Sequence, residues 1–345
     1  MTCSAKLALP DAPRLLIVRP DRVGDVIIST SCITPIRQFF PRSALYFYAA
    51  ERMRPLLDDH PGLDGFLSNP SQIGPLKLDA VIHLHPDSAC YRGARDANVP
   101  VRIGYQQRFL TRYLTHSLPD HRSEGIKHEA AYNFDLLQLV GLPLPEHFTP
   151  NVQLPESARD SLRAKMPWPL ESTPFAVLNS SAHSPIARWP AEYFQRVADW
   201  LDKELNLKPV FVVADATDSL IGAGAHHLNL AGQTNLAELG WLLKHARVSI
   251  TRDTGPSHLA AAVGCPVVII FGRTAPLYGP TRWRPLTENA IIVTKPIHRE
   301  HWESRDRHWQ RSFAAITVEE VMAAVRQILA STDGLRERPQ DQVSQ

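Results

Sequence analysis

The run from Val248 to Gly272, VSITRDTGPSHLAAAVGCPVVIIFG, carries residue types that suit the binding of an anion. A strand is predicted to end at Asp253, Thr254 and Gly255 to form a tight turn, and a helix to begin at the proline that follows. Its N–H groups and positive dipole end favour a diphosphate, with the Thr254 hydroxyl as a further donor. His258 lies one turn into this helix. The alternative is that Asp253 and Thr254 only cap the helix.

A second segment, residues 179–194 (NSSAHSPIARWPAEYF), leads from a strand through a Ser-rich turn into another helix. The hydroxyls of Ser180 and Ser181 and the guanidinium of Arg188 are predicted to converge on the same anion site. The two serines are equally well explained as satisfied turn residues. Trp189 is interpreted as a packing anchor rather than a ligand contact.

The third candidate is the N-terminal junction at 17–27, IVRPDRVGDVI, which again joins a strand to a helix. It lacks GxGxxG, so no dinucleotide fingerprint is present. Gly24 lets the backbone pass close to a ligand. Asp25 stands at the helix start, where its carboxylate serves either as a cap or dipole partner or as a general base.

These junctions require strands that alternate with helices, the pattern of parallel sheets built from βαβ units. Short apolar runs predict strands at 14–19, 44–50, 65–67, 80–84, 175–179, 210–214, 227–230, 248–251, 267–271 and 290–293. Apolar periodicity predicts helices at 25–40, 127–140, 156–165, 191–205, 236–245, 256–263 and 318–329. The region 91–125 is predicted to be rich in loops. Two α/β halves would leave a ligand cleft at the carboxyl ends of two sheets.

Composition agrees with two soluble domains. The chain has 345 residues, a net charge of +2 and 29 prolines, of which seven fall in the predicted linker at 143–174. The four cysteines have no metal or disulfide spacing. No apolar signal segment or bilayer-spanning run is found, so a cytoplasmic protein is expected.

The near-neutral balance conceals an arginine-rich stretch, predicted to form an anion-binding surface, that contains Arg92, Arg95, Arg102, Arg108, Arg112 and Arg122. Nucleic acid is disfavoured as its partner because aromatic residues do not alternate with these cations. His83 and His85 share one strand face, which suits an acceptor sugar better than a metal ion. His298, His301 and His308 are assigned to an aromatic loop.

Together, LLIVRPDRVGDVI, RWPAEYF and NLAGQTNLAELGWLLKHARVSITRDTGPSHLAAAVGCPVVIIFGRT resemble glycosyltransferase family 9, the lipopolysaccharide heptosyltransferases. The resemblance implies a GT-B fold in which two Rossmann-like domains face each other across a cleft. Residues 1–168 would bind the acceptor and 169–317 the nucleotide sugar; the helix at 318–330 would cross back to the first domain, and 331–345 would form a tail.

The resemblance also implies an inverting transfer without a metal ion or other cofactor, with ADP-heptose as donor. Asp25 would be the general base, Thr254 and Gly255 would meet the diphosphate, and Asp253 and His258 would lie near the heptose. Gly24, Arg92, Arg95 and Arg102 would line the acceptor side. The acceptor would be an anionic or lipid-linked saccharide, such as a lipopolysaccharide core intermediate, reached by peripheral contact with the inner membrane.

Two departures from the family pattern matter. Many members carry a Lys two residues before the Trp of the WP motif, where this chain has Ala187. Arg188 or Arg273 would take over its charge, and if neither does, stabilisation of the transition state should be weaker. The Gly-rich turn that ends in a ribose-binding Glu is replaced by a stretch containing Asp215 and Asp218. Each of these two is equally well explained as a ligand of the ribose hydroxyls or as a turn residue. Two alternatives remain open. The protein could transfer another sugar or use another acceptor, or it could bind the donor without catalysing transfer. The sequence does not fix an oligomeric state.

Overall fold

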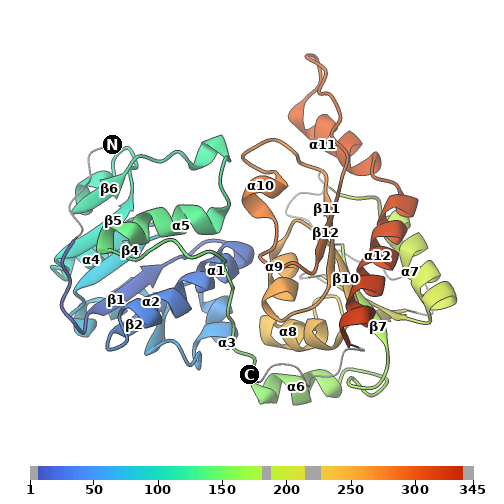
Figure 1. Cartoon of the computed structure of the whole chain (residues 1–345), viewed down its shortest axis with the longest axis horizontal. Coiled ribbons are helices and arrows are strands. Elements are labelled where there is room, and N and C mark those ends of the chain that lie inside the picture. Colours follow the sequence, from blue (N-terminus) through green and yellow to red (C-terminus); the bar gives the residue numbers. More distant parts are fainter. Residues whose placement is uncertain (1–6, 181–187, 214–226, 337–345) are drawn as a thin grey trace. The chain divides into compact units, whose positions relative to one another are not determined.

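The computed structural model describes residues 7–180, 188–213 and 227–336. The chain divides into two compact units, the first formed by 1–155 with 281–286 and the second by 156–280 with 287–345. Each unit contains one parallel sheet of six strands with helices on its faces (Figure 1). The predicted α/β fold class is therefore confirmed.

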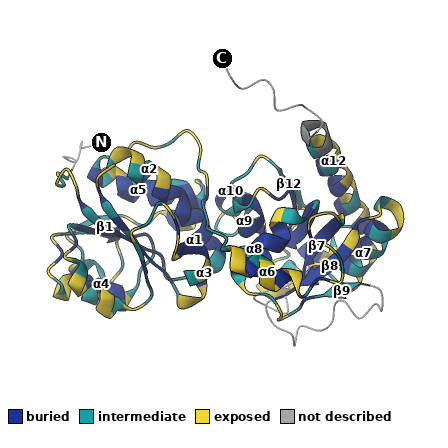
Figure 2. Ribbon diagram, turned by 90° about the horizontal axis from the view of Figure 1, so that it is seen from below, coloured by how far each residue is buried: buried dark blue, intermediate teal, exposed yellow. Residues whose placement is uncertain are grey.

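The first sheet has the order β3-β2-β1-β4-β5-β6. Its strands are β1 (Arg14–Val18), β2 (Ala44–Tyr48), β3 (Gly65–Leu67), β4 (Ala80–His83), β5 (Val101–Tyr105) and β6 (His116–Leu118). The helices of this part of the chain are α1 (Val23–Ser29), α2 (Ile33–Phe39), α3 (Arg54–Leu57), α4 (Ser88–Asp96) and α5 (Glu129–Leu137). Helices α1, α2 and α5 lie on one face of the sheet and α4 on the other (Figure 2).

The second sheet repeats this order in its own strands, β9-β8-β7-β10-β11-β12. These strands are β7 (Phe175–Asn179), β8 (Lys208–Val212), β9 (Leu228–Asn229), β10 (Val248–Arg252), β11 (Val267–Phe271) and β12 (Ala290–Thr294). The accompanying helices are α6 (Glu156–Arg163), α7 (Ala191–Leu205), α8 (Leu236–His245), α9 (Gly255–Ala262), α10 (Pro280–Trp283), α11 (Arg305–Ala314) and α12 (Val318–Arg336). Figure 1 shows α8 and α9 on one side of this sheet and α7 and α12 on the other.

All the predicted strands and helices overlap observed ones, but several boundaries changed. The helix predicted at 25–40 is interrupted by a 3-10 turn at Thr30–Cys32. There Thr30 and Ser31 donate their hydroxyls to the carbonyls of Ile27 and Ile28, at 2.7 and 2.6 Å. Such bonds back to the preceding turn compete with regular helix geometry.

The region 91–125 is not the loop that the sequence predicts, because it holds most of α4 together with β5 and β6. The apolar pattern that predicts strands is weak in this region because an arginine, Arg102, lies within one of its strands. Arg102 lies within β5 and donates hydrogen bonds to the carbonyls of Tyr113 and Val99. The aromatic segment that contains His308 is likewise helical, as α11.

Helix α12, which covers the helix predicted at 318–330, packs within the second unit. Val318, Val321, Val325 and Ile328 are buried in the core of the second unit together with α7 and strands β7, β10 and β11. The segment of the later chain that joins the first unit is 281–286.

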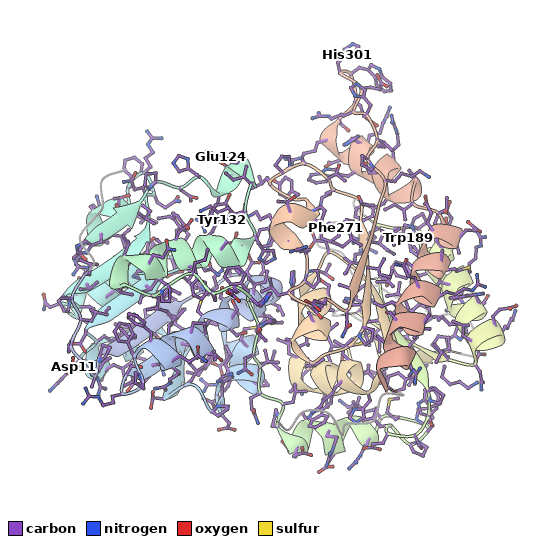
Figure 3. All side chains as sticks on the ribbon, viewed as in Figure 1. Asp11, Glu124, Tyr132, Trp189, Phe271 and His301 are labelled. Atoms are coloured by element: carbon purple, nitrogen blue, oxygen red, sulfur yellow. The ribbon has the colours of Figure 1, made fainter. Side chains whose placement is uncertain are left out.

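Trp189, labelled in Figure 3, is 1% exposed in the same core and donates its indole N–H to the Ile316 carbonyl at 2.8 Å. Its interpretation as a packing anchor is confirmed.

We expect Gly272→Ala to destabilise the second unit. Gly272 follows β11, and a Cβ there would lie 2.4 to 2.5 Å from ring atoms of the buried Phe313. Overpacking of this kind costs roughly 1–3 kcal/mol. Thermal denaturation should show a lower Tm for this variant, and the matched change Gly74→Ala, whose Cβ meets nothing within 4 Å, should leave Tm unchanged. Equal melting of both variants would contradict the packing described.

Candidate active site

In each sheet the strand order reverses beside the first strand, between β1 and β4 and between β7 and β10. Parallel α/β sheets bind ligands at the carboxyl ends of the strands at this point. The loop from Arg19 to Arg22 follows β1, and Asp253 and Thr254 follow β10. The topology thus places both predicted junctions where ligands bind in such sheets.

Asp25 does not cap its helix. The N-cap of α1 is Arg22, and Asp25 lies inside the first turn, with 8% of the residue exposed. One carboxylate oxygen, Oδ1, accepts a hydrogen bond from Arg19 Nη2 at 2.6 Å. No described residue donates to Oδ2, so this oxygen is available to accept a proton.

The pKa of Asp25 is raised from 3.8 to about 6. Burial is the main cause, because it disfavours the charged form, and the carboxylates of Asp21 and Glu129 add to it, whereas Arg19 opposes it. A carboxyl with a pKa close to neutral is suited to general base chemistry.

Arg19 is the partner that the sequence analysis missed. Its side chain is 2% exposed and donates to Asp21 Oδ1 at 2.7 Å, Glu129 Oε1 at 2.9 Å and Asn133 Oδ1 at 3.3 Å, besides Asp25. Glu129 and Asn133 stand one turn apart on α5, so both face the same guanidinium. Two features of the sequence could have indicated this pair. Arg19 is a charged residue directly after the apolar strand LLIV, and Glu129 stands in the otherwise apolar start of α5.

The predicted acceptor-side residues do not form one cluster. Gly24 is adjacent to Asp25 in α1, whereas Arg92 and Arg95 are exposed on α4 and Arg102 belongs to β5. Arg95 forms an ion pair with Asp96 and lies 4.9 Å from the Tyr113 ring centroid. Arg102 is engaged with backbone carbonyls.

The two histidines at the end of β4 have different surroundings. His83 is 1% exposed, packs edge-on against Tyr91, and burial lowers its pKa to about 3. His85 is half-buried with Nδ1 3.3 Å from Asp21, and burial lowers its pKa. Among the described residues no group of three or more His, Cys, Asp and Glu side chains is placed to hold a metal ion.

At the second junction, Thr254 occupies the N-cap position of α9, but its side chain makes no capping hydrogen bond. The hydroxyl instead lies 3.3 Å from the Arg252 carbonyl and 3.4 Å from the buried amide nitrogen of Asn179. Thr254 therefore stands at the N-cap position without capping the helix through its side chain. Ser257 N donates to the Thr254 carbonyl and Pro256 has no N–H, so the helix start offers fewer donors than expected.

Other predicted donor-side residues surround this turn. Asp253 Oδ2 accepts from Arg273 Nη2 at 3.2 Å, and the Arg273 guanidinium lies over the rings of Tyr278 and Trp309. His258 is 4% exposed in α9. Ser180, 2% exposed after β7, has a hydroxyl without a hydrogen-bond partner among the described residues.

Arg188 is half-buried just before the buried Trp189. Four positions named in the sequence analysis, Ser181, Ala187, Asp215 and Asp218, lie outside the described residues. The described helices include none long and apolar enough to span a bilayer.

The chain is similar to known proteins in both sequence and fold. The model of glycosyltransferase family 9 (heptosyltransferase) matches residues 79–312. Lipopolysaccharide heptosyltransferase 3 of Escherichia coli K12 is 24% identical, over 89% of this chain and 95% of its own.

Solved structures of similar fold include the family 9 glycosyl transferase of Veillonella parvula, with a TM-score of 0.79, 21% identity, and coverage of 94% of this chain and 99% of that one. The ADP-heptose lipopolysaccharide heptosyltransferase II of E. coli has a TM-score of 0.78 and 20% identity, with 93% and 99% covered. The predicted GT-B fold is thereby confirmed.

The raised pKa of Asp25 predicts a stability difference that can be measured without substrate. Between pH 4 and 6 the folded protein holds a proton on Asp25 that the unfolded chain has lost, so the free energy of unfolding falls as pH rises. The gap between 3.8 and about 6 corresponds to about 3 kcal/mol.

Urea denaturation of the wild type and Asp25→Asn from pH 4 to 7 tests this. Asn cannot ionise, so the wild type should lose stability relative to the variant as pH rises. A constant difference across this range would show that the pKa of Asp25 is not raised.

Proposed function

The chain belongs to glycosyltransferase family 9 and is a glycosyltransferase, and on this premise we propose that it transfers a heptose from ADP-heptose to a lipopolysaccharide inner-core saccharide. The observation that carries the proposal is the buried Asp25, with one oxygen held by Arg19 and a pKa of about 6. The E. coli protein of similar fold is described as an ADP-heptose enzyme, which supports this choice of donor.

In the proposed reaction Asp25 Oδ2 accepts the proton of the acceptor hydroxyl as its oxygen attacks the anomeric carbon of the heptose. The new glycosidic bond forms while the bond from that carbon to the β-phosphate oxygen breaks, and ADP leaves with the electron pair. Attack from the face opposite the leaving group inverts the anomeric configuration. The reaction needs a base for the nucleophile and an anion site for the diphosphate. In this proposal the junction at Asp25 provides the base and the junction at Thr254 the anion site.

On the donor side we assign the diphosphate to Thr254, Gly255, Ser180 and Arg188. The Thr254 hydroxyl and the Ser180 hydroxyl remain able to turn toward an anion, since neither caps a helix. Arg188 supplies the cation, because it is adjacent in sequence to Ala187, the position of the family Lys. Arg273 forms an ion pair with Asp253. Asp253 and His258 would then orient the heptose, in a reaction that uses no metal ion.

On the acceptor side, Arg92 and Arg95 present exposed cations on α4 that suit phosphates or carboxylates of a lipopolysaccharide core. Such a surface also favours peripheral contact with an anionic membrane on the cytoplasmic side. Another sugar or acceptor is the competing assignment. Ala187, in place of the family Lys, favours impaired or altered use of the donor.

We expect Asp25→Asn to lower kcat about 10²–10⁴-fold, because general base catalysis contributes on this order. The binding of ADP, measured by calorimetry, should stay unchanged. Release of ADP from ADP-heptose in the presence of core acceptors gives the rate, and Asp58→Asn, an exposed carboxylate in the same unit, serves as control. Near-normal turnover by Asp25→Asn would overturn the base assignment, and transfer only from other nucleotide sugars would overturn the donor.

The assignment of the cation is tested by Arg188→Gln and Arg273→Gln. Loss of a hydrogen bond from a charged donor costs about 1.5–3 kcal/mol, so we expect Arg188→Gln to weaken ADP binding roughly tenfold or more. Arg273→Gln should weaken it less, since this side chain holds Asp253. Calorimetry with ADP alone compares them, and the reverse order of affinities would assign the diphosphate to Arg273.

A further inference from the structure

Arg19, the ion-pair partner of Asp25, belongs to a larger buried cluster of ion pairs in the first unit. Glu129 is fully buried, and both of its oxygens are occupied. Oε1 accepts from Arg19 Nη1 at 2.9 Å, and Oε2 accepts from Arg282 Nε at 2.8 Å and lies 2.7 Å from Arg282 Nη2. A carboxylate removed from water this completely is tolerated only with such partners.

Arg282 reaches this cluster from far along the chain, since it is 153 residues after Glu129. Its own segment, 281–286, belongs to the first unit. Arg282 Nη1 also donates to the Arg122 carbonyl at 2.9 Å, and His128 Nε2 lies 2.8 Å from the Arg284 carbonyl. Several bonds therefore fix Arg282 against the start of α5.

Within the charge balance of the cluster, Asp25 differs from the other carboxylates in its affinity for a proton. Three guanidinium groups are faced by four carboxylates in a set made of Arg19, Arg122, Arg282, Asp21, Asp120, Glu129 and Asp25. The pKa values of Glu129 and Asp120 are lowered, while that of Asp25 is raised. Asp25 is therefore the member poised to take up a proton.

Further titratable groups adjoin the cluster and do not alter this count near pH 7. Burial lowers the pKa of His128 and raises that of Tyr105, so both are neutral. His85 faces Asp21, and burial lowers its pKa, so it is neutral. Cys32 is fully buried near Arg19, and burial raises its pKa to about 12, so the thiol is neutral as well. The charges that act directly on Asp25 are those of Arg19, Asp21 and Glu129.

We propose that Arg282 is a positioning residue for the base, acting on Asp25 through Glu129 and Arg19. This inference rests on the proposed role of Asp25. Arg282 holds one oxygen of Glu129, which leaves only the other for Arg19 and keeps Arg19 Nη2 directed at Asp25 Oδ1. Without Arg282, both Glu129 oxygens compete for Arg19, and the carboxylate of Asp25 loses its fixed orientation and part of its stabilisation.

The experiment uses Arg282→Met in the full chain and measures the pH profile of kcat together with KM for donor and acceptor. Removing one positive charge stabilises the protonated form of Asp25, so the acid limb should move upward by about 0.5–1 pH unit. We expect kcat at neutral pH to fall about tenfold, with both KM values within about twofold. Glu129→Gln removes a negative charge and should move the same limb downward.

Two variants separate positioning from simple loss of structure. Arg284→Met makes the same exchange in the same segment at an exposed side chain and should keep the wild-type profile. The pair Glu129→Gln with Arg282→Met restores the charge balance and should return the limb toward its wild-type pH. An unshifted limb in Arg282→Met, or a fall in rate that Arg284→Met shares, would overturn the proposal.

A readout without catalysis keeps this test distinct from that of the base. The urea stability of Arg282→Met is compared with that of the double variant Arg282→Met with Asp25→Asn across pH 4–7. The pH at which the two diverge reports the proton affinity of Asp25 and should lie higher than in the wild-type background. If Asp25→Asn is inactive and this pH is unchanged, the positioning role fails while the base assignment stands. If Asp25→Asn is active, the base assignment itself fails.

Discussion

The burial of Glu129 is the constraint around which the first unit is arranged. A carboxylate with no exposed surface must be surrounded by donors, and Arg19, Arg122 and Arg282 approach it from three different segments. Because Arg19 lies directly after β1 and Glu129 opens α5, their pairing fixes the helix against the end of the central strand. The same guanidinium then orients Asp25, so one desolvated pair links the stability of the fold to the state of the candidate base.

The two junctions use opposite electrostatic means although their sheets have the same strand order. At the first, an excess carboxylate is buried among paired charges, which raises its affinity for a proton. At the second, the backbone at the start of α9 offers few free N–H donors to an anion, since Pro256 lacks an N–H and Ser257 N is already bonded. An anion there must be held largely by side chains. This explains why the identity of the cation near Trp189 matters more than the helix dipole alone suggests.

The features that could be predicted from the sequence are those encoded by a local pattern of residues. Apolar strands such as 267–271 and the strand-turn-helix junctions at 24–25 and 254–255 were placed correctly, because their signals lie within a few residues. Strands β5 and β6 were missed because Arg102 and His116 interrupt the apolar pattern, and the side chain of Arg102 is accommodated by distant carbonyls. The Arg19–Glu129 pair spans 110 residues, and no local pattern in one sequence identifies such a partner.

The ion pairs of Glu129 also determine which residues a complete first domain must contain. The first unit has its own sheet, yet it takes in 281–286 from the later part of the chain. Residues 1–155 alone would keep Glu129 and lose the two guanidinium nitrogens that approach its Oε2. Such a fragment would bury an under-compensated charge, a cost that Arg19 and Arg122 together do not remove, because Arg122 lies as far as 3.9 Å from Oε1. A boundary drawn through the Pro-rich linker therefore separates two sheets without separating two self-sufficient folds.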